Sequence, residues 1–426
     1  MTLEQIVGRI TRAVNLTTLA GVTLLGLDTN PVPSDWSHVS KVDPEGEKRL
    51  PLAFPLYLAE TSAVSVGGSR DVTPQNTEET MNLVAATETP VLHEPSGASH
   101  VTQGTRGDAD YFAVPEVLNG EAEALVGTLG QGLDYVREEF GPGLVSNRLG
   151  IPLDGDGIIG RRVGDFTAGY LMNEAVFEAY IIMNPESAAA REAGVTESDL
   201  LSPESARQRA LAAEYHLGSE VIYLEYSGTF GGDEAVETLE AVDDACSWPR
   251  LWYGGGLDSG EKAEQVLAAG ADAVVVGDVF HDVAELEAEL FDQARRTFDD
   301  VPTHDRVTDW VESTVDVETV SATRYLSTIP DIDDAPARAT RYLAASLEFG
   351  LACAALAETV ENPSGEDISA AVAEDTRLTE TRLAGSLNGS QRELSRRIAG
   401  SLVAESFDVV VENGFATRHL GISLDP

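Results

Sequence analysis

The sequence predicts an α/β protein built on a modified (β/α)8 barrel, with an all-helical extension at its C-terminus. Short apolar runs dense in Val, Ile, Leu and Tyr recur along the first 300 residues, and helical patterns separate several of them. The runs show little alternation of polar and apolar residues, which is typical of parallel strands covered on both faces. Eight such runs within about 250 residues match the strand count of this barrel.

The predicted strands and helices alternate along the chain, as in other α/β proteins. The eight predicted strands are Trp36–Asp43, Ala63–Gly67, Pro90–His93, Asp110–Val114, Glu178–Met183, Glu220–Glu225, Arg250–Gly254 and Asp272–Gly277. The clearest helical patterns between them are Glu78–Ala86, Ser202–His216, Glu234–Ala245 and Gly260–Ala269.

Two connections are expected to be irregular. The stretch between His93 and Asp110 is rich in Gly, Ser and Thr and has no periodic apolar face, so a loop is expected there in place of one barrel helix. Residues 141–169 are rich in glycine, and a second long loop near the barrel mouth is expected there.

The barrel is predicted to lie between two extensions. Residues 1–33 precede it, residues 34–300 form it, and residues 301–426 form a helical domain without βα repeats. The predicted helices of this domain are Ala335–Leu356, Asp367–Leu387 and Ser390–Phe407, with a turn at Asn388-Gly389. The apolar stripe of the first helix must pack against something. We expect the barrel or another subunit; the alternative is reversible contact with a membrane.

The charge balance is strongly acidic. The chain carries 72 Asp and Glu against 28 Lys and Arg, a formal net charge of −44, and only three of the basic residues are lysines. This argues against nucleic-acid binding, which depends on basic side chains that neutralise phosphates. Such a chain repels itself unless counterions screen it, so we hypothesise a cytosol of molar salt. The alternative is an acidic interaction protein.

The sequence favours a cytosolic protein. No apolar run approaches the ~18 residues that a membrane helix needs. The N-terminus has no basic region followed by a long apolar block, so a secretory signal is not expected. Two cysteines, Cys246 and Cys353, do not make a disulfide framework.

Glycine turns follow the last two predicted strands. Gly255 and Gly256 follow strand seven, and Gly277, followed by Asp278, ends strand eight. Exposed backbone N–H groups and a following helix N-terminus can hold a phosphate without basic side chains. The alternative is that these glycines only make tight turns.

Other polar residues lie where predicted strands one, two and six end. Asp43 and Ser69 could supply a carboxylate and a hydroxyl oxygen to Mg²⁺. Lys41 lies two residues before Asp43, so both point to the same face of the strand. Asp43 could instead cap a turn, and Lys41 could lie at the surface. Strand six ends in Glu225, followed by further hydroxyls and a glycine.

Together these motifs resemble the geranylgeranylglyceryl phosphate synthase family, which includes the heptaprenylglyceryl phosphate synthases. The resemblance runs from Trp36 to His281 through eight ordered blocks: HVSKVDP, VGGS, HEPSG, YFAVPEVLN, AYIIMNP, IYLEYSGT, WYGGGLDS and VVVGDVFHD. The family fold is a modified TIM barrel in which an irregular segment replaces one helix. Neither extension is part of the resemblance.

The resemblance implies a reaction and a set of site residues. The enzyme would join the C3 hydroxyl of sn-glycerol 1-phosphate to geranylgeranyl diphosphate through an ether bond, releasing diphosphate. It would be a cytoplasmic homo-oligomer that depends on Mg²⁺, held by Asp43 and Ser69, with Glu225 orienting the hydroxyl or accepting its proton. The glycerol phosphate site would comprise Lys41, Tyr223, Leu224, Glu225, Tyr226, Ser227, Gly228, Gly255, Gly256, Gly277 and Asp278. The prenyl chain would lie in a groove across the barrel top that uses Phe112, Val114, Val117 and Leu118.

Two positions depart from the family pattern. Many relatives read DPDK where this chain has Asp43-Pro44-Glu45-Gly46, so the nearest basic residue is Lys48. Many read GN where this chain has Gly277-Asp278, and an aspartate there would repel a phosphate. The alternatives are therefore a non-catalytic phosphate-binding paralogue with a helical docking module, and a different phosphate-binding barrel enzyme.

Overall fold

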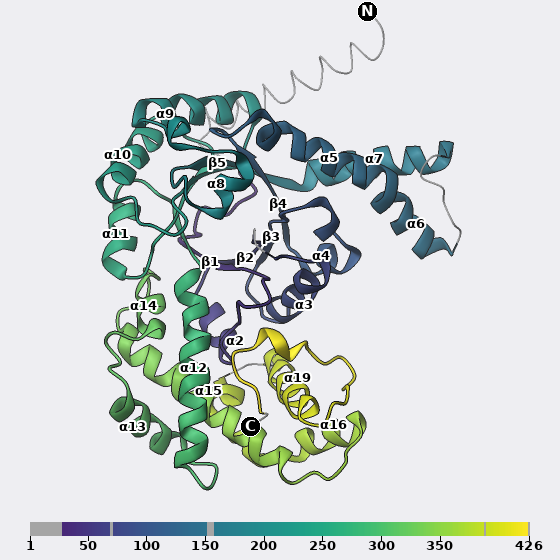
Figure 1. The fold of residues 1–426 in the computed structure, drawn as a ribbon, viewed down its shortest axis with the longest axis vertical. Helices are drawn as coiled ribbons and strands as arrows, with labels where there is room; N and C mark the ends of the chain where they lie inside the picture. Colours follow the sequence, from purple (N-terminus) through teal and green to yellow (C-terminus); the bar gives the residue numbers. More distant parts are fainter. Residues whose placement is uncertain (1–27, 69–70, 151–156, 387–388, 425–426) are drawn as a thin grey trace, which may run out of the picture.

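The chain folds around a closed parallel barrel of eight strands (Figure 1). The computed structural model describes residues 28–68, 71–150, 157–386 and 389–424. The strands are β1 (His38–Val42), β2 (Ala63–Val66), β3 (Val91–His93), β4 (Tyr111–Val117), β5 (Ala175–Ile182), β6 (Val221–Glu225), β7 (Arg250–Gly254) and β8 (Ala273–Val276). They pair in sequence order, and β1 closes the barrel against β8. The predicted barrel is confirmed, although β4 ends three residues later and β5 begins three residues earlier than expected.

Helices surround the barrel and continue beyond it. Those up to the end of β8 are α2 (Phe54–Leu58), α3 (Pro74–Val84), α4 (Gln103–Asp108), α5 (Thr128–Tyr135), α6 (Gly141–Leu149), α7 (Ile158–Glu174), α8 (Ala188–Ala193), α9 (Pro203–Ala212), α10 (Gly232–Asp243) and α11 (Gly260–Ala268). The later ones are α12 (Asp278–Thr297), α13 (His304–Thr314), α14 (Ser321–Ser327), α15 (Ala335–Ala357), α16 (Gly365–Glu374), α17 (Thr376–Glu380), α18 (Arg382–Ser386) and α19 (Gly389–Glu405).

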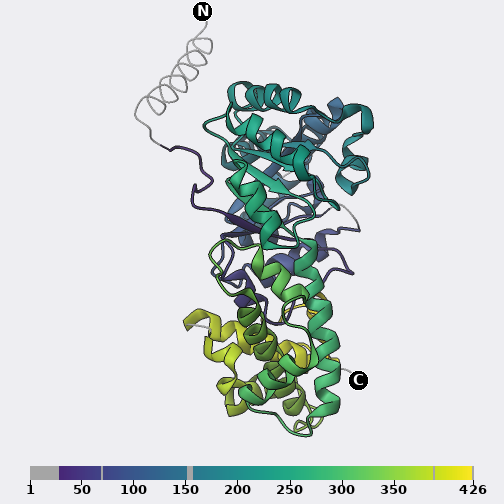
Figure 2. The ribbon, with the colours of Figure 1, turned by 90° about the vertical axis from the view of Figure 1, so that its left-hand side faces the viewer.

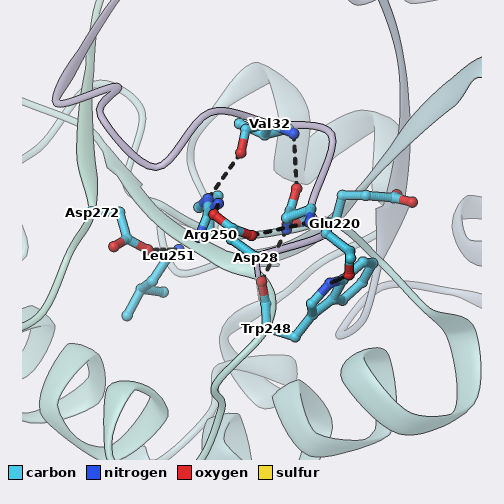
Figure 3. A network of polar contacts seen from close by, with 9 residues as sticks. Asp28, Val32, Glu220, Trp248, Arg250, Leu251 and Asp272 are labelled. Atoms are coloured by element: carbon cyan, nitrogen blue, oxygen red, sulfur yellow. Dashed lines mark hydrogen bonds and ion pairs between the residues drawn. The ribbon is translucent and has the colours of Figure 1, made fainter. Parts of the chain in front are cut away.

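The amino ends of the strands are closed by the segment that precedes β1 (Figure 3). Asn30 donates hydrogen bonds from Nδ2 to the carbonyls of Glu220 (2.8 Å) and Trp248 (3.0 Å). Arg250, at the start of β7, donates from Nε to the Val32 carbonyl at 3.0 Å. The Val32 side chain is fully buried and belongs to the cluster that fills the barrel interior. The carboxyl ends of the strands therefore remain as the end that can carry a site.

Two crossovers lack a full barrel helix. Between β3 and β4 there is a short 3₁₀ turn and the six-residue α4, which matches the irregular segment predicted there. Between β1 and β2 the five-residue α2 is also shorter than a normal crossover helix. The C-terminal helices cover the barrel wall here. Tyr325 of α14 bonds Ser40 of β1 at 2.5 Å, and the Tyr57 ring of α2 lies 5.1 Å from that of Tyr342 of α15.

The C-terminal helices share the core of the barrel instead of standing apart from it. Figures 1 and 2 show these green-to-yellow helices beside α12 and α2. One cluster of buried apolar side chains runs from Val42 of β1 to Leu402 of α19. The apolar stripe of α15 is buried, including Leu343, Leu347 and Leu351. Packing of this helix within the protein is confirmed, and the membrane alternative for this stripe is wrong because no apolar face remains free.

The expected loop over residues 141–169 is wrong. Most of that stretch forms α6 and α7, which project from the barrel with α5 (Figure 1). Two of these glycines, Gly141 and Gly164, allow helices to approach closely, while Gly150 ends α6 in the left-handed conformation. A Cβ atom at Gly164 would lie 2.0 Å from the carbonyl oxygen of Arg137, and one at Gly141 would lie 2.9 Å from Oγ1 of Thr167. Helix packing therefore outweighs the low helix propensity of glycine here.

Some predictions fall outside the described residues. Residues 1–27 of the N-terminal extension and Asn388 of the predicted helix turn are among them. Among the helices that the structure does describe, none combines the length and the apolarity that a bilayer span requires.

Glu287 is a fully buried carboxyl group where α12 meets the loop before α2. Its Oε2 accepts a hydrogen bond from the Leu52 backbone N–H at 2.5 Å, whereas Oε1 has no partner among the described residues. Burial raises the pKa of Glu287 to about 8 from 4.5, against the opposing hydrogen bonds from the backbone. The folded protein therefore holds a proton here that the unfolded chain releases.

Replacement Glu287→Gln should remove a pH dependence of stability. Because the folded-state pKa is raised, the contribution of Glu287 is greatest below pH 4.5 and is lost as the pH rises through about 8. The glutamine keeps the acceptor for Leu52 but cannot ionise. In thermal unfolding in molar KCl, the free energy of unfolding of the wild type should fall by a few kcal/mol as the pH rises from 4.5 to about 8. That of the variant should fall by less. The exposed Glu289→Gln on the same helix is the control, and parallel curves for all three proteins would contradict the prediction.

Candidate functional site

Glu94 is the centre of a polar cluster inside the barrel mouth. It follows β3 and forms an ion pair with Lys41 of β1. Its other carboxylate oxygen accepts a hydrogen bond from the Tyr180 hydroxyl of β5 at 2.6 Å, and Ser65 of β2 donates to the first oxygen at 3.2 Å. The Lys41 and Glu94 side chains are 19% and 14% exposed, so the pair lies just below the surface of the mouth. Three strands, β1, β2 and β5, thus place polar groups on one carboxylate.

Sequence reasoning did not find Glu94 as a site residue. It lies within the HEPSG block, but an acid in a Gly- and Ser-rich connection gave no reason to expect it inside the barrel. Glu178 was also missed. It is an acid within the apolar β5 strand, and that isolated acid was the signal that could have found it.

Glu178 lies deeper in the same cluster and is 1% exposed. Burial raises the pKa of Glu178 well above its usual value, Glu94 raises it further, and Lys41 opposes both. Burial by itself would lower the pKa of Lys41, but the carboxylates, above all Glu94, raise it. In this cluster Lys41 therefore stays charged beside Glu94, while the more deeply buried Glu178 favours its protonated form.

Glu225 and Tyr223 lie on the inner face of β6. The Tyr223 ring packs edge-on against Tyr180 with 4.6 Å between ring centroids. Glu225 is 3% exposed, and its Oε2 has no hydrogen-bond partner among the described residues. Burial raises the pKa of Glu225, while hydrogen bonds from Ser227 and the charge of Lys41 oppose the rise. A buried, unpartnered carboxylate oxygen needs a donor, and a bound hydroxyl group would supply it.

Asp43 and Asp278 share one cation, Lys48. Its Nζ lies 2.7 Å from Oδ1 of Asp278 and 3.7 Å from Oδ2 of Asp43. The two departures from the family pattern therefore meet in space, because the displaced lysine pairs with the unexpected aspartate. The Asp43 backbone N–H donates to Nε2 of His281 in α12 at 3.1 Å, which fixes the start of the loop after β1.

The glycine turns lie where the sequence placed them. Gly255 (φ 138°) and Gly256 (φ 58°) adopt backbone conformations that side chains disfavour, and a Cβ at Gly255 would lie 2.5 Å from the Tyr226 backbone. A Cβ at Gly277 would lie 3.3 Å from Cβ of Lys41. Neither α11 nor α12, which follow these turns, has a side-chain N-cap hydrogen bond. Their first N–H groups therefore remain available to an anion.

Not every predicted binding side chain faces the mouth. Leu224 and Tyr226 point outward into the core between β6 and the helices, where the Tyr226 hydroxyl lies 3.4 Å from Glu234 of α10. Only their backbone could reach a ligand. Ser227 and Gly228 are exposed after β6, and the Ser227 carbonyl accepts a hydrogen bond from Asn184 at 2.6 Å.

The residues predicted for the prenyl groove are also divided. Phe112 and Val114 lie on the outer face of β4, packed with Met172 of α7. Val117 packs against the cluster of the barrel interior instead, and Leu118 packs against the outer core. Phe112 and Val114 therefore cannot line a groove across the barrel top as expected.

The predicted magnesium ligands are only partly visible. Ser69 lies outside the described residues, but Gly68 before it lies against Asp43, so that a Cβ there would be 3.3 Å from Oδ1 of Asp43. Among the described residues, no group of three or more His, Cys, Asp or Glu side chains could hold a metal ion by itself. A single carboxylate in an open mouth still fits Mg²⁺, which commonly takes one or two protein oxygens and completes its shell with water and phosphate.

The C-terminal tail holds the loop after β1 that carries Asp43 and Lys48. Leu50 in this loop donates its N–H to the His419 carbonyl and accepts from the Gly421 N–H, both at 2.8 Å. Arg418 and His419 also bond Glu79 of α3, at 2.6 and 2.8 Å. The buried Leu420 and Ile422 anchor the tail in the core. The last residues of the extension thus form part of the support of the mouth.

Comparisons with known proteins give one consistent result. A family model described as the PcrB family matches residues 33–295. A geranylgeranylglyceryl phosphate synthase of Natronomonas pharaonis is 32% identical over 269 residues, which are 62% of this chain and 98% of that protein. The one from Haloquadratum walsbyi is 30% identical over 251 residues, 58% of this chain and 89% of that protein.

The chain is also similar to a bacterial protein and to one solved structure. A heptaprenylglyceryl phosphate synthase of Bacillus thuringiensis is 30% identical over 254 residues, 58% of this chain and 92% of that protein. The crystal structure of (S)-3-O-geranylgeranylglyceryl phosphate synthase from Thermoplasma acidophilum, in complex with sn-glycerol-1-phosphate, has 23% identity and a TM-score of 0.41. It covers 58% of this chain and 86% of that chain. Residues 296–426 lie outside the family match.

Replacement Glu94→Gln should destabilise the barrel mouth. The glutamine can still accept from Tyr180 and Ser65, but Lys41 loses its ion-pair partner and faces Glu178 instead. Because the pair is partly exposed, we expect a loss of no more than about 3 kcal/mol in the free energy of unfolding at neutral pH. Denaturant unfolding measures it, with Glu186→Gln, an exposed residue after β5, as the control. Equal stability of both variants would contradict the role assigned to Glu94.

Replacement Gly421→Ala should loosen the loop that carries Asp43. The new methyl group would lie 2.6 Å from the Ala284 carbonyl oxygen, so the tail must move away from α12 and weaken its two hydrogen bonds to Leu50. We expect the dissociation constants for Mg²⁺ and inorganic phosphate to rise several-fold, as titration calorimetry would measure.

The control for Gly421→Ala is Gly385→Ala, since a Cβ at Gly385 meets no atom within 4 Å. A fall in melting temperature without any change in either dissociation constant would show that the tail stabilises the fold without positioning the loop.

Proposed function

The chain belongs to the PcrB family, and from this premise we propose that it is a prenyltransferase that acts on glycerol phosphate. In the finer form of the proposal, it joins the C3 hydroxyl of sn-glycerol 1-phosphate to geranylgeranyl diphosphate and releases diphosphate. Relatives that share about 30% identity over nearly their whole length carry the names of geranylgeranylglyceryl and heptaprenylglyceryl phosphate synthases, which supports the proposal.

The observation that carries the proposal is the unpartnered Oε2 of Glu225 in the barrel mouth. A buried carboxylate oxygen without a hydrogen-bond donor destabilises the folded protein unless a bound ligand supplies that donor. A glycerol hydroxyl is such a donor. The Tyr223 ring lies deeper in the barrel than Glu225 on the same strand, and the bound glycerol can pack against this ring.

Glu225 is also the group that can take the proton of the attacking hydroxyl. The glycerol oxygen forms a bond to C1 of the prenyl chain, the bond from C1 to the diphosphate oxygen breaks with its electrons going to diphosphate, and the hydroxyl proton moves to Glu225. A pKa raised by burial makes Glu225 a stronger base than a free glutamate, and the Ser227 hydrogen bonds and the charge of Lys41 oppose part of that rise. Holding the glycerol oxygen and C1 of the prenyl chain in place accounts for most of the remaining rate enhancement.

The acceptor phosphate is proposed to bind the turns after β7 and β8. The uncapped N-termini of α11 and α12 follow these turns and favour an anion. Asp278 would repel it, but Lys48 lies 2.7 Å from its carboxylate and offsets that charge. The unusual aspartate is therefore compatible with phosphate binding in this chain.

Asp43 and Ser69 remain the proposed ligands of Mg²⁺. When bound, the ion would neutralise the charge that develops on the leaving diphosphate. Asp43 is held in place for this role from two sides: its backbone N–H bonds His281, and its carboxylate faces Lys48.

We also propose that the protein works in a cytosol of molar salt. Both cysteines are free thiols, which suits a reducing compartment. The net charge of −44 requires screening by counterions. A homo-oligomer stays a prediction from the family resemblance.

A transfer assay in molar KCl tests the proposal. With Mg²⁺, labelled sn-glycerol 1-phosphate and geranylgeranyl diphosphate, the wild type should form butanol-extractable label. Glu225→Gln should lower kcat about 100-fold or more, since it removes the base. Asp43→Asn should abolish most of the activity and weaken the response to Mg²⁺. The rate should fall on the acid side at a pH above the ordinary glutamate value of 4.5.

Glu186→Gln is the control for this assay and should leave turnover unchanged. If no product forms although sn-glycerol 1-phosphate binds tightly, the protein is a non-catalytic paralogue. If neither substrate binds, the barrel serves another phosphorylated ligand and the proposal fails.

A further inference from the structure

All three lysines of the chain lie at the carboxyl end of the barrel. Lys41 is in β1 and Lys48 is in the loop after β1, while Lys262 of α11 donates from Nζ to the Gly256 carbonyl at 3.0 Å. Every other residue among the 28 Lys and Arg is an arginine. A lysine ammonium group is a compact point charge that suits phosphate oxygens. The three lysines are therefore candidates for binding the phosphate groups of substrates.

Two of these lysines already have firm partners in the protein. Lys41 forms its ion pair with Glu94 inside the mouth. Lys262 lies 2.7 Å from Oδ1 of Asp258, in addition to its hydrogen bond to the turn after β7. The other carboxylate oxygen of Asp258 lies 2.8 Å from Arg324 of α14, so this cluster ties the turn to the C-terminal helices. Both lysines therefore support the structure of the rim.

Lys48 is held less firmly. Its partner at 2.7 Å, Asp278, has a side chain that is 74% exposed, and an exposed ion pair contributes little to stability. The other nearby carboxylate, that of Asp43, is 3.7 Å away, which is beyond hydrogen-bond distance. An ammonium group has three N–H donors, and within the part of the chain that the structure describes only Asp278 accepts from this one. Lys48 can therefore donate to a ligand without the loss of a strong internal contact.

The backbone around Lys48 is fixed, however. The ring of His281 in α12 bonds both sides of the loop: Nε2 accepts from the Asp43 N–H at 3.1 Å, and Nδ1 lies 2.9 Å from the Arg49 carbonyl. Because Nε2 accepts, the ring proton is on Nδ1, which donates to that carbonyl. His281 is only 5% exposed. The loop thus confines the Lys48 ammonium group to the space between Asp43 and the start of α12.

We propose that Lys48 is a binding residue for the diphosphate group of the prenyl donor. The proposal rests on the proposed function, in which Asp43 lies at the diphosphate site. Since Nζ of Lys48 is 3.7 Å from the Asp43 carboxylate, a diphosphate at that site comes within reach of the ammonium group. Lys48 exchanges Asp278 for a diphosphate oxygen and keeps its own proton. Its charge offsets the negative charge that the leaving group gains as the bond from C1 to oxygen breaks.

The alternative is that Lys48 only offsets the charge of Asp278. Asp278 is the first residue of α12, so its carboxylate acts on the proposed site of the acceptor phosphate. The two roles differ once residue 278 is neutral. A lysine that only offsets Asp278 then becomes dispensable, whereas a lysine that binds diphosphate does not.

Phosphorus NMR titration with inorganic diphosphate, in molar KCl with EDTA, tests the proposal. Lys48→Gln should raise the dissociation constant about tenfold or more, because a hydrogen bond between charged groups is lost. The decisive comparison is between Asp278→Asn and the double variant Lys48→Gln, Asp278→Asn. The double variant should bind diphosphate about tenfold more weakly. Since the Debye length in molar salt is ~3 Å, this difference reports a direct contact.

The kinetics give a second measurement. In the transfer assay, Lys48→Gln should lower kcat and raise KM for geranylgeranyl diphosphate more than KM for sn-glycerol 1-phosphate. Arg161→Gln is the control, because this arginine of α7 is exposed and forms no ion pair with any residue that the structure describes. It should bind diphosphate and turn over as the wild type does. All variants should melt at the wild-type temperature.

Two results would overturn the inference. One is equal diphosphate binding by Asp278→Asn and the double variant, which would leave Lys48 the role of offsetting Asp278. The other is a loss of affinity in Lys48→Gln that is confined to sn-glycerol 1-phosphate, which would assign Lys48 to the acceptor. If the wild type forms no product but binds diphosphate through Lys48, the binding role is supported and only the proposed function fails.

Discussion

Three carboxyl groups share one ammonium group inside the barrel mouth. Glu94 pairs directly with Lys41, while Glu178 and Glu225 lie buried within range of its charge. Carboxylates this close in a poorly solvated space cannot all be ionised without a cation. Burial raises the pKa of Glu178 and of Glu225, and the charge of Lys41 opposes both rises, so Lys41 is one of the groups that set the state of Glu225, the proposed base.

The rim of the mouth depends on a part of the chain outside the family match. The loop after β1 carries Asp43 and Lys48, and its far end is paired at Leu50 with the tail around Gly421. The same extension covers β1, where α2 is too short to do so. The extension thus replaces a missing barrel helix and supports the candidate site at once. This explains why its apolar helices share a single core with the barrel.

The acidic composition limits where the protein can bind anionic ligands. Most of the surface repels anions, so anionic ligands must be bound by local features. At the mouth these are helix N-termini, with a lysine that offsets the one aspartate nearby. These features act over a few ångströms, which is the range that remains in molar salt.

The sequence by itself determined the barrel, because strand patterns and turn residues act locally and occur in order along the chain. It also placed Lys41, Asp43, Tyr223, Glu225 and the glycine turns at one end, since parallel strands gather their carboxyl ends on one rim. It could not find Glu94 as the partner of Lys41, because the pairing joins residues that only barrel closure brings together. Glycines at 141 and 164 looked like turn residues, since their role in close helix packing depends on a neighbour far away in the sequence. The tail contact at Gly421 and the outward direction of Phe112 likewise follow from long-range packing, which no local pattern encodes.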